Sequence, residues 1–412
     1  MTFDHDVAIV GAGAAGIAAA NRLAAAGRSV ILLEAGTRIG GRAWTLGIAG
    51  MALDMGCGWL HSAGRNPLVN LGERAGFRII RGPSAWHVQW RDLGFSAGEQ
   101  QAAGRAWARL EQRLRASPPP GDRASDALEP GNPWNDYCQA LSGYLNGASL
   151  DRLSVRDFLA YDDAATDDNW RVEEGYGTLI GSALAPDVTL RLAAPVRKIS
   201  LASGGVRLEG DRGTLTAGAA IVTASTNVLA RGAIAFDSQV DSHLEAAGRL
   251  PLGLADKLFL ELHGNHGLEA ETHLLGNPAN AGTGSYYIRP LGRPVIEGFF
   301  GGTGAVRLEK ARLLEAFAFT LEELTALLGS DIRRHLRPLA ATSWCDLDWI
   351  HGSYSHALPG HADARAILAA PVDGRLFFAG EATHPHDFST AHGAWETGLR
   401  AADEVLATLT GV

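Results

Sequence analysis

The 412-residue chain has few cysteines, no long apolar run and a deficit of positive charge. Its three cysteines, Cys57, Cys138 and Cys345, lack metal-ligand spacing and cannot form a complete disulfide framework, which fits a reducing compartment. No segment approaches the ~20 consecutive apolar residues that a membrane-spanning helix needs. Lysine and arginine total 36 against 45 aspartate and glutamate residues, a net charge of −9. We therefore expect neither a membrane anchor nor a nucleic-acid partner.

The N-terminus reads MTFDHDVAIV and enters a strand without the basic and apolar segments of a signal peptide, so a cytoplasmic location is expected. Apolar residues make up 46% of the chain and charged residues 20%, as in an ordinary globular protein. A chain of this length predicts two domains, each of which could be discontinuous in sequence. Oligomeric state is not predicted.

The order of elements predicts an α/β fold. Residues 6–10 form a short apolar strand, GAGAAG follows, and then come an alanine-rich helix and the strand SVILLE. Residues 188–224 alternate and turn like a β-meander, and RLFFAG near the end is again typical of a buried strand. Between these parts we expect helices over 97–115 and 310–329, with a Pro- and Gly-rich loop over 117–133. The segments 6–34 and 374–409 therefore predict a nucleotide-binding domain interrupted by insertions.

The first motif that predicts a ligand is a glycine pattern between the first strand and the helix that follows it. Gly11 permits the turn, Gly13 lets the backbone approach a pyrophosphate, and Gly16 lets helix and strand pack closely. Phosphate would then lie at a helix N-terminus. Glu34 ends the second strand, where a carboxylate would bind a ribose diol and disfavour a 2′-phosphate.

A second glycine loop distinguishes the candidate dinucleotides. Gly40, Gly41 and Arg42 follow Glu34 within AGTRIGGRAWT, where arginine could offer bidentate hydrogen bonds to the same pyrophosphate. The alternative is a glycine-rich turn with a surface arginine. Two phosphate-binding loops so close together favour FAD.

At this point the sequence resembles the flavin-containing amine oxidases, a family that includes monoamine oxidases, polyamine oxidases and flavin-dependent histone demethylases. The resemblance rests on VAIVGAGAAGIAAANRL, EAGTRIGGRAWT, LDMGCGWLHSAGRNP, PVRKISL, AAIVTASTNVL, GLADKLFLEL, WCDLDWIHGSYSHALPG and FFAGEATHPHDFSTAHGAWETGLRAA. The C-terminal segment resembles polyamine oxidases and histone demethylases more than monoamine oxidases, and the chain as a whole resembles polyamine oxidases most. Ser353 stands where monoamine oxidases carry a flavin-linked cysteine, so the resemblance implies noncovalent FAD.

The resemblance implies roles for individual residues. Lys257 would face flavin N5 through a water, His61 would lie near the substrate amine, and Tyr354 and Thr390 occupy the places of a tyrosine pair. The other residues with an implied cofactor contact are Gly58, Trp59, Val196 at the adenine, Trp344 and Trp349 at the isoalloxazine, Glu381 at the ribityl chain and Ala391 at the pyrimidine edge. Ser389 and Thr390 precede the last helix, so its positive end would face the flavin.

Lys257 is unusual within its own strand. Leu258, Leu260 and Leu262 alternate with Lys257, Phe259 and Glu261, which predicts a strand with one buried face. A lysine there would ordinarily mark the solvated face. The resemblance implies instead that its side chain points into a catalytic cavity.

The predicted organisation is a Rossmann-like FAD-binding domain, a parallel sheet plus β-meander, with an inserted α+β substrate-binding domain. The FAD-binding domain would comprise residues 1–85, 185–245 and 340–412, and the substrate-binding domain 86–184 and 246–339. Two features depart from the family: ASTNVL at 224–229 lacks the usual proline, and the chain is shorter than typical relatives. Substrate length and identity stay open.

The predicted reaction is oxidation of an amine C–N bond by hydride transfer to FAD, with dioxygen as acceptor and hydrogen peroxide as product. An L-amino-acid oxidase is an alternative, in which Arg289 or Arg307 would clasp the substrate carboxylate; so is a noncatalytic flavin-binding module. A histone demethylase would need a partner-binding insertion that the sequence does not display.

Several of these residues could also have a purely structural role. Trp344 and Trp349 could be core aromatics, His61 a structural histidine, and Tyr354 a turn residue. His384, His386 and Asp387 resemble a metal-binding cluster, but we expect a turn that carries polar side chains and binds no metal.

Overall fold

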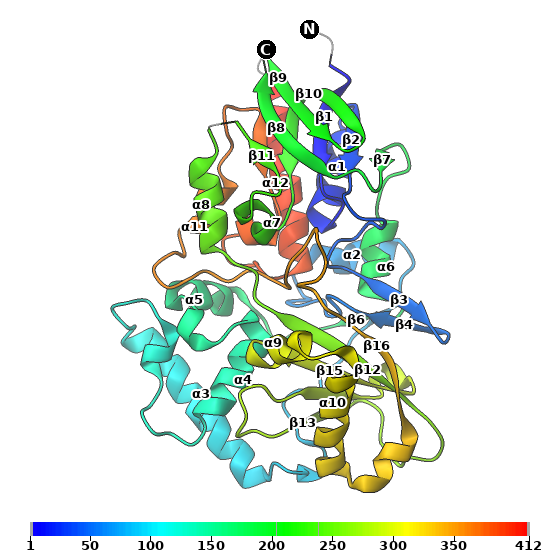
Figure 1. Ribbon diagram of the computed structural model, residues 1–412, viewed down its shortest axis with the longest axis vertical. Coiled ribbons are helices and arrows are strands. Elements are labelled where there is room, and N and C mark those ends of the chain that lie inside the picture. The colour runs from blue at the N-terminus through cyan, green and yellow to red at the C-terminus, as the bar shows by residue number, and fades with distance from the viewer. Residues whose placement is uncertain (1–2, 203, 238, 410–412) are drawn as a thin grey trace.

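The structure is a computed structural model that describes residues 3–202, 204–237 and 239–409. Figure 1 shows two layers of structure stacked along the long axis, each built on its own sheet, with both chain ends at the top of the upper part. The chain crosses between the two parts several times, so neighbours in space are often distant in sequence. The domain boundaries given above stay a prediction.

The upper part is built on an eight-stranded sheet with the order β11-β8-β9-β10-β1-β2-β7, in which β17 also pairs with β10. Parallel pairs join β10, β1, β2 and β7, whereas β8, β9 and β10 form the antiparallel meander that the sequence predicts. The strands are β1 (His5–Val10), β2 (Val30–Leu33), β7 (Thr189–Arg191), β8 (Val196–Ala202), β9 (Gly205–Gly210), β10 (Gly213–Val222), β11 (Ala235–Phe236) and β17 (Leu376–Phe378). The α/β class is thus confirmed.

The lower part is built on a five-stranded antiparallel sheet with the order β13-β14-β15-β12-β16. Its strands are β12 (Ala255–Leu262), β13 (Thr272–Leu275), β14 (Ser285–Ile288), β15 (Val295–Gly301) and β16 (Leu336–Ala341). Two further antiparallel pairs are short: β3 (Thr45–Ile48) with β4 (Met51–Asp54), and β5 (Ile79–Ile80) with β6 (Arg171–Val172).

The prediction of one buried face for β12 is wrong, because both faces of this strand are covered. Leu258 and Leu260 pack in the core of the five-stranded sheet, and Phe259 packs on the opposite face against Met51 and Leu53. The β3–β4 pair supplies that second cover. Neither face of β12 is exposed to solvent at Lys257.

Helices cover both sheets. They are α1 (Ala14–Ala25), α2 (Pro67–Arg74), α3 (Ala97–Ala116), α4 (Asn135–Asn146), α5 (Val155–Ala164), α6 (Tyr176–Ser182), α7 (Thr226–Ala230), α8 (Asp241–Arg249), α9 (Thr303–Lys310), α10 (Leu313–Leu328), α11 (Ala364–Ala369) and α12 (Ala391–Leu409). Helix α3 begins at a capping box, in which Ser96 accepts from the N–H of Glu99 and the Glu99 carboxylate accepts from the N–H of Ser96.

The helix predicted over 310–329 is α10, which begins slightly later than predicted, at Leu313. Helix α9 ends at Lys310, and Arg312 has extended backbone angles before α10 begins. The Glu315 carboxylate accepts a hydrogen bond from the N–H of Arg312, which marks a new helix start. The predicted end holds, because α10 terminates before Gly329 at φ +84°.

Helices α1 and α12 lie side by side on the upper sheet and come from opposite ends of the chain (Figure 1). A Cβ at Gly398 would lie 2.1 Å from the carbonyl oxygen of Ala15, so the two backbones touch only because this residue is glycine. The N-termini of both helices therefore reach the same region of the molecule.

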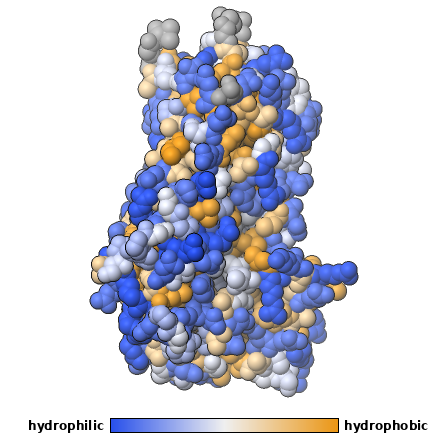
Figure 2. Space-filling view, turned by 60° about the vertical axis from the view of Figure 1, so that its left-hand side comes forward, coloured by the Kyte–Doolittle hydropathy of each residue, from blue (hydrophilic) through white to orange (hydrophobic). Residues whose placement is uncertain are grey.

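Apolar residues on the face in Figure 2 occur in small groups among hydrophilic ones. Within the described ranges, no helix combines the length and hydropathy needed to cross a bilayer.

Candidate active site

A cavity of about 1310 Å³ lies between the two sheets. Its lining includes every residue that the sequence predicts for the site except Gly16: Gly11, Gly13, Glu34, Gly40, Gly41, Arg42, Gly58, Trp59, His61, Val196, Lys257, Trp344, Trp349, Tyr354, Glu381, Thr390 and Ala391. Gly16 lies behind the first turn, where a Cβ would be 1.9 Å from the Gly11 carbonyl oxygen. The structure thus brings pieces of the whole chain to one cavity.

Two glycine loops form one end of the cavity and contact each other. Gly11 has φ +102°, and Gly40 donates its N–H to the Ala12 carbonyl at 2.8 Å. A Cβ on Gly41 would lie 3.3 Å from the Gly13 Cα, which keeps the two loops close. Helix α1 starts at Gly13, which has no side chain to cap the first-turn N–H groups. These N–H groups line a site suited to phosphate.

Glu34 is held beside these loops by backbone donors. Its carboxylate accepts from the N–H of Ala12 at 2.8 Å and from the N–H of Gly36 at 2.7 Å. The side chain is thereby fixed at the end of β2, where the sequence predicts a ribose contact.

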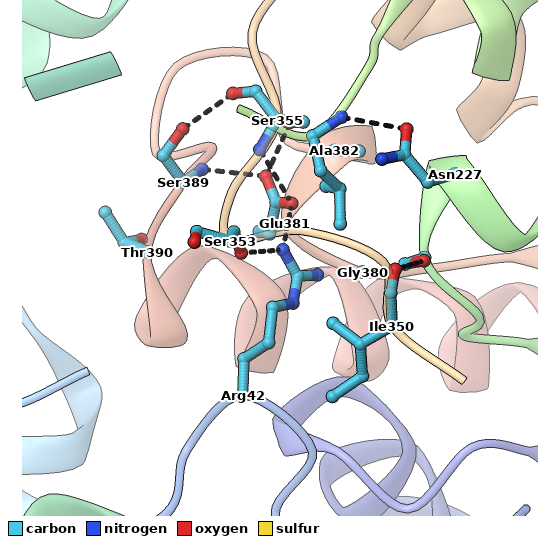
Figure 3. A network of polar contacts seen from close by, with 12 residues as sticks. Arg42, Asn227, Ile350, Ser353, Ser355, Gly380, Glu381, Ala382, Ser389 and Thr390 are labelled. Carbon is cyan, nitrogen blue, oxygen red and sulfur yellow. Dashed lines mark hydrogen bonds and ion pairs between the residues drawn. The ribbon is translucent and has the colours of Figure 1, made fainter. Parts of the chain in front are cut away.

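Arg42 and Glu381 form the centre of a polar network (Figure 3). The Arg42 guanidinium donates to Glu381 at 2.8 Å and to the Ser353 carbonyl at 2.7 Å. The Glu381 carboxylate also accepts from the N–H and hydroxyl of Ser355 and from the N–H of Ser389. Its two oxygens thus accept four protein hydrogen bonds, so its main visible task is to hold the loops around the cavity.

Arg365 extends this network away from the cavity. Its guanidinium makes a bidentate pair with Asp157 at 2.6 and 2.8 Å and donates to the Ser355 hydroxyl at 2.9 Å. Burial alone would raise the pKa of Glu381, but the charges of Arg42 and Arg365 outweigh it and hold the pKa below its ordinary value. Asp157, Arg365, Glu381 and Arg42 therefore alternate in charge through the interior.

Lys257 is 7% exposed and lines the cavity from β12. Its Nζ donates to the Asp54 backbone carbonyl at 2.8 Å and lies 2.8 Å from the Glu297 carboxylate on β15. A Cβ on Gly58 would lie 3.2 Å from this Nζ, so that glycine lets the neighbouring loop approach the ammonium group. Lys257 lies in the cavity as the family resemblance implies, and its catalytic role stays a prediction.

His61 lines the cavity as a neutral imidazole. Burial lowers its pKa to about 4, although the hydrogen bond to Asn169 opposes this. The Asn169 amide nitrogen donates to the Asp167 carbonyl, so its oxygen faces His61 Nδ1 at 2.6 Å. His61 Nδ1 therefore carries the proton, and Nε2 carries a lone pair that could accept a hydrogen bond from an amine.

Thr390 and Tyr354 use their hydroxyl groups within the protein. The Thr390 hydroxyl donates to the Asp387 carbonyl at 2.6 Å and accepts from the Gly393 N–H at 3.0 Å, as the N-cap residue of α12. The Tyr354 hydroxyl donates to the Tyr144 carbonyl at 2.6 Å. Thr390 thus orients the helix whose first residue, Ala391, lines the cavity.

Trp344 and Trp349 lie in different surroundings. Trp344 packs edge-on against Trp44, with ring centroids 6.3 Å apart, whereas Trp349 lies under the Arg197 guanidinium, next to Val196. Trp59 contacts Trp86 and Tyr287 across the cavity. That Trp344 and Trp349 both line the flavin ring stays a prediction.

The His384, His386 and Asp387 group is occupied by protein partners. Its ligand atoms lie within 4.8 Å of one another, but Arg65 holds both Asp387 oxygens, and His384 Nδ1 accepts the Asp387 N–H at 2.7 Å. The expectation of a turn without metal stays a prediction.

Comparison with known proteins decides the family. A sequence profile described as "Flavin containing amine oxidoreductase" matches residues 14–118 and 114–406. The chain belongs to this family. Among its relatives, polyamine oxidase 4 of Oryza sativa subsp. japonica is 28% identical over 97% of this chain and 88% of its own. Lysine-specific histone demethylase 1 homolog 3 of the same subspecies is 30% identical over 98% of this chain, which spans 54% of that protein.

Solved amine oxidases share the fold. A putrescine oxidase bound to putrescine superimposes with a TM-score of 0.78 at 21% identity, over 98% of this chain and 99% of the other. Cyclohexylamine oxidase from Brevibacterium oxydans IH-35A gives a TM-score of 0.77 at 20% identity, over 99% and 100%. The Rossmann-like fold and the class of flavin-dependent amine oxidoreductase are thus confirmed.

The amine oxidase site fits a flavin dinucleotide on its own geometry. The glycine loops leave room that a Cβ would fill, and the uncapped N-terminus of α1 offers N–H groups to phosphate.

Three residues that shape the site carry no prediction from the sequence: Glu297 in the lining, and Arg365 and Asp157 behind it. Glu297 carries a detectable signal, because VIEGFF places a charge inside an apolar strand as Lys257 does in its own. Arg365 and Asp157 are 208 residues apart and give no local signal. Arg289 and Arg307, proposed for a substrate carboxylate, do not line the cavity: Arg289 donates to the Leu268 carbonyl, and Arg307 stacks on Phe319.

Proposed function

We propose that the protein binds FAD noncovalently and oxidises a C–N bond of an amine, with dioxygen as the final acceptor and hydrogen peroxide as a product. The observation that carries this proposal is the buried ammonium group of Lys257, which lines the same cavity as both glycine loops. Bound FAD would supply the capacity to accept a hydride from the carbon next to the amine nitrogen.

The glycine loops and the α1 N-terminus would hold the pyrophosphate, and Glu34 the ribose. The α12 N-terminus, fixed by Thr390, would place its positive end at the flavin pyrimidine edge. Lys257 would hold a water at its ammonium group. The division into FAD-binding and substrate-binding domains at the predicted boundaries follows from these assignments.

His61 would position the substrate. Because Nε2 carries the lone pair, it can accept a hydrogen bond from the amine nitrogen and orient the α-carbon. The amine must be unprotonated before it can give up a hydride, so activity should rise on the alkaline side. His61 stays neutral well below neutral pH and would not itself cause that rise.

The proposal that FAD is noncovalent is supported by the residues near the cavity. Ser353 uses its hydroxyl on the backbone of Ala255, and Cys57 is the cysteine in the lining. Burial raises the pKa of the Cys57 thiol to about 12, which keeps it protonated and unreactive.

The test starts from purified protein, which should be yellow and should release free FAD on acid precipitation. Anaerobic addition of amine should bleach the flavin, and air should restore the colour with formation of hydrogen peroxide. Colour that stays in the precipitate would contradict noncovalent binding. Flavin that no amine bleaches would favour the noncatalytic flavin-binding module instead.

A further inference from the structure

The part of the cavity remote from the glycine loops is aromatic. Segments 86–161 and 273–299 supply it, with rings that include Trp86, Trp107, Tyr137, Tyr144 and Phe299. Within these two described segments, Glu297 is the one carboxylate in the lining. An amine with several ammonium groups would need more than one anionic partner there.

Glu297 already has a cationic partner. Its Oε1 lies 2.8 Å from Lys257 Nζ, so its charge is balanced before substrate enters. Asp54, at the edge of this region, has its carboxylate bonded to the Thr45 hydroxyl and the Tyr176 N–H. Glu323 lies behind the lining and accepts from Thr283, Gly284 and Tyr286.

Positive charge faces the same space. Arg171 lines the cavity over the Trp59 ring and pairs with Glu271, which is outside the lining. Arg293 also lines it and donates to the Glu173 backbone carbonyl. With Lys257, three cations face this space, against two carboxylates in this part of the lining, Glu297 and Asp54, both of which already have protein partners.

We infer that the substrate is a monoamine with a large apolar group, such as an alkyl or arylalkyl amine, and that a second ammonium group is selected against. This inference rests on the proposed amine oxidation. The apolar group would gain by leaving water for the aromatic lining. A second ammonium would lose hydration there, and contact with aromatic faces returns less than that loss.

Two matched substrate pairs test the inference. Pentylamine and putrescine have the same number of heavy atoms and differ by a methyl in place of the second amine. 2-Phenylethylamine and phenylalanine differ by a carboxylate. We expect half-saturation of anaerobic flavin reduction at a concentration at least about tenfold lower for pentylamine than for putrescine, and likewise for 2-phenylethylamine than for phenylalanine. Putrescine or spermidine equal to or better than pentylamine would overturn the inference, as would preference for phenylalanine.

Variants test the charge argument within one protein. Leu141 lines the cavity from α4, so L141E should shift the preference toward putrescine by about tenfold, while L141Q, of similar size, should not. The variant E297Q should affect pentylamine and putrescine to the same extent. A loss confined to putrescine in E297Q would show that Glu297 binds a second ammonium, and would overturn the inference.

A binding measurement separates this inference from the proposed function. With the flavin reduced by dithionite beforehand, pentylamine should raise Tm at lower concentration than putrescine does. If no amine reduces the flavin, the proposed function fails. If putrescine reduces the flavin and binds more tightly than pentylamine, only the substrate inference fails.

Discussion

Lys257 has its ammonium group between the Asp54 carbonyl and the Glu297 carboxylate. The variant K257M keeps the length of the side chain but removes the charge, so FAD should remain bound while flavin reduction or reoxidation slows about tenfold or more. Stopped-flow measurement of each half-reaction checks this.

The double variant K257M/E297Q is the control for the carboxylate that K257M leaves unpaired. If both half-reactions of K257M proceed at the rates of the unchanged enzyme, the proposed role of Lys257 is refuted.

Thr390 offers a second single-residue prediction, because its hydroxyl caps α12 by accepting from Gly393. T390V should lower the free energy of unfolding by about 1 kcal/mol, whereas T390S should retain it. Urea unfolding of the two variants measures this difference. A T390V protein of unchanged stability with tenfold slower flavin reduction would instead support a direct catalytic role for the hydroxyl.

At the scale of elements, the pair of Arg365 on α11 and Asp157 on α5 joins segments from both parts of the molecule. Both side chains are nearly inaccessible, so R365M leaves a buried carboxylate unpaired and should cost about 3–5 kcal/mol of unfolding free energy. Chemical denaturation gives this value.

The neighbouring exposed pair Arg156–Asp363 provides a matched control. R156M should cost less than about 1 kcal/mol, because solvent screens that pair. The double variant D157N/R365M should recover part of the loss, and a loss from R365M no larger than that from R156M would contradict the assignment.

The sequence predicts the elements better than the contacts between them. The GAGAAG turn, the meander and α12 follow from local patterns that also decide the fold of the upper sheet. The break between α9 and α10 depends on one hydrogen bond of Glu315, which periodicity does not reveal. The second cover of β12 comes from β3 and β4, some 200 residues earlier, so one buried face was the natural but wrong prediction.

For the site too, the sequence predicts local motifs better than contacts between distant residues. The glycine loops were predictable from local signals, whereas the cavity position of Lys257 followed from the family resemblance, because the strand pattern alone favours a solvated lysine. The cofactor and substrate roles that the resemblance implies for Thr390 and Glu381 stay predictions, and the sequence does not reveal the hydrogen bonds that both side chains make within the protein. Only the folded chain shows how many protein donors compete for such groups.

For the whole molecule, buried histidines predict a pH dependence of stability. Burial lowers the pKa of His61, His273 and His356 to about 4 each, below the ordinary 6.5. Between these values the unfolded chain binds the protons and the folded chain does not, so stability should fall as pH decreases from 6.5 toward 4. Each histidine contributes at most about 1.4 kcal/mol per pH unit.

Asp256 opposes this slope, since burial raises its pKa to about 8 and its contribution is lost as pH rises. Urea unfolding between pH 4.5 and 6.5 should still show a net decrease toward acid. H273N should flatten the curve, and H263Q, at an exposed position, should not. An unchanged slope in H273N would contradict the assignment.

The contact between α1 and α12 has a consequence for biosynthesis. Helix α1 is synthesised early, whereas its partner α12, which lines the cavity beside the glycine loops, is synthesised only after both sheets. A nascent chain can therefore build most of the upper sheet while its cavity still lacks one side. A cofactor that needs this wall could then be held firmly only after residues 391–409 have docked on α1.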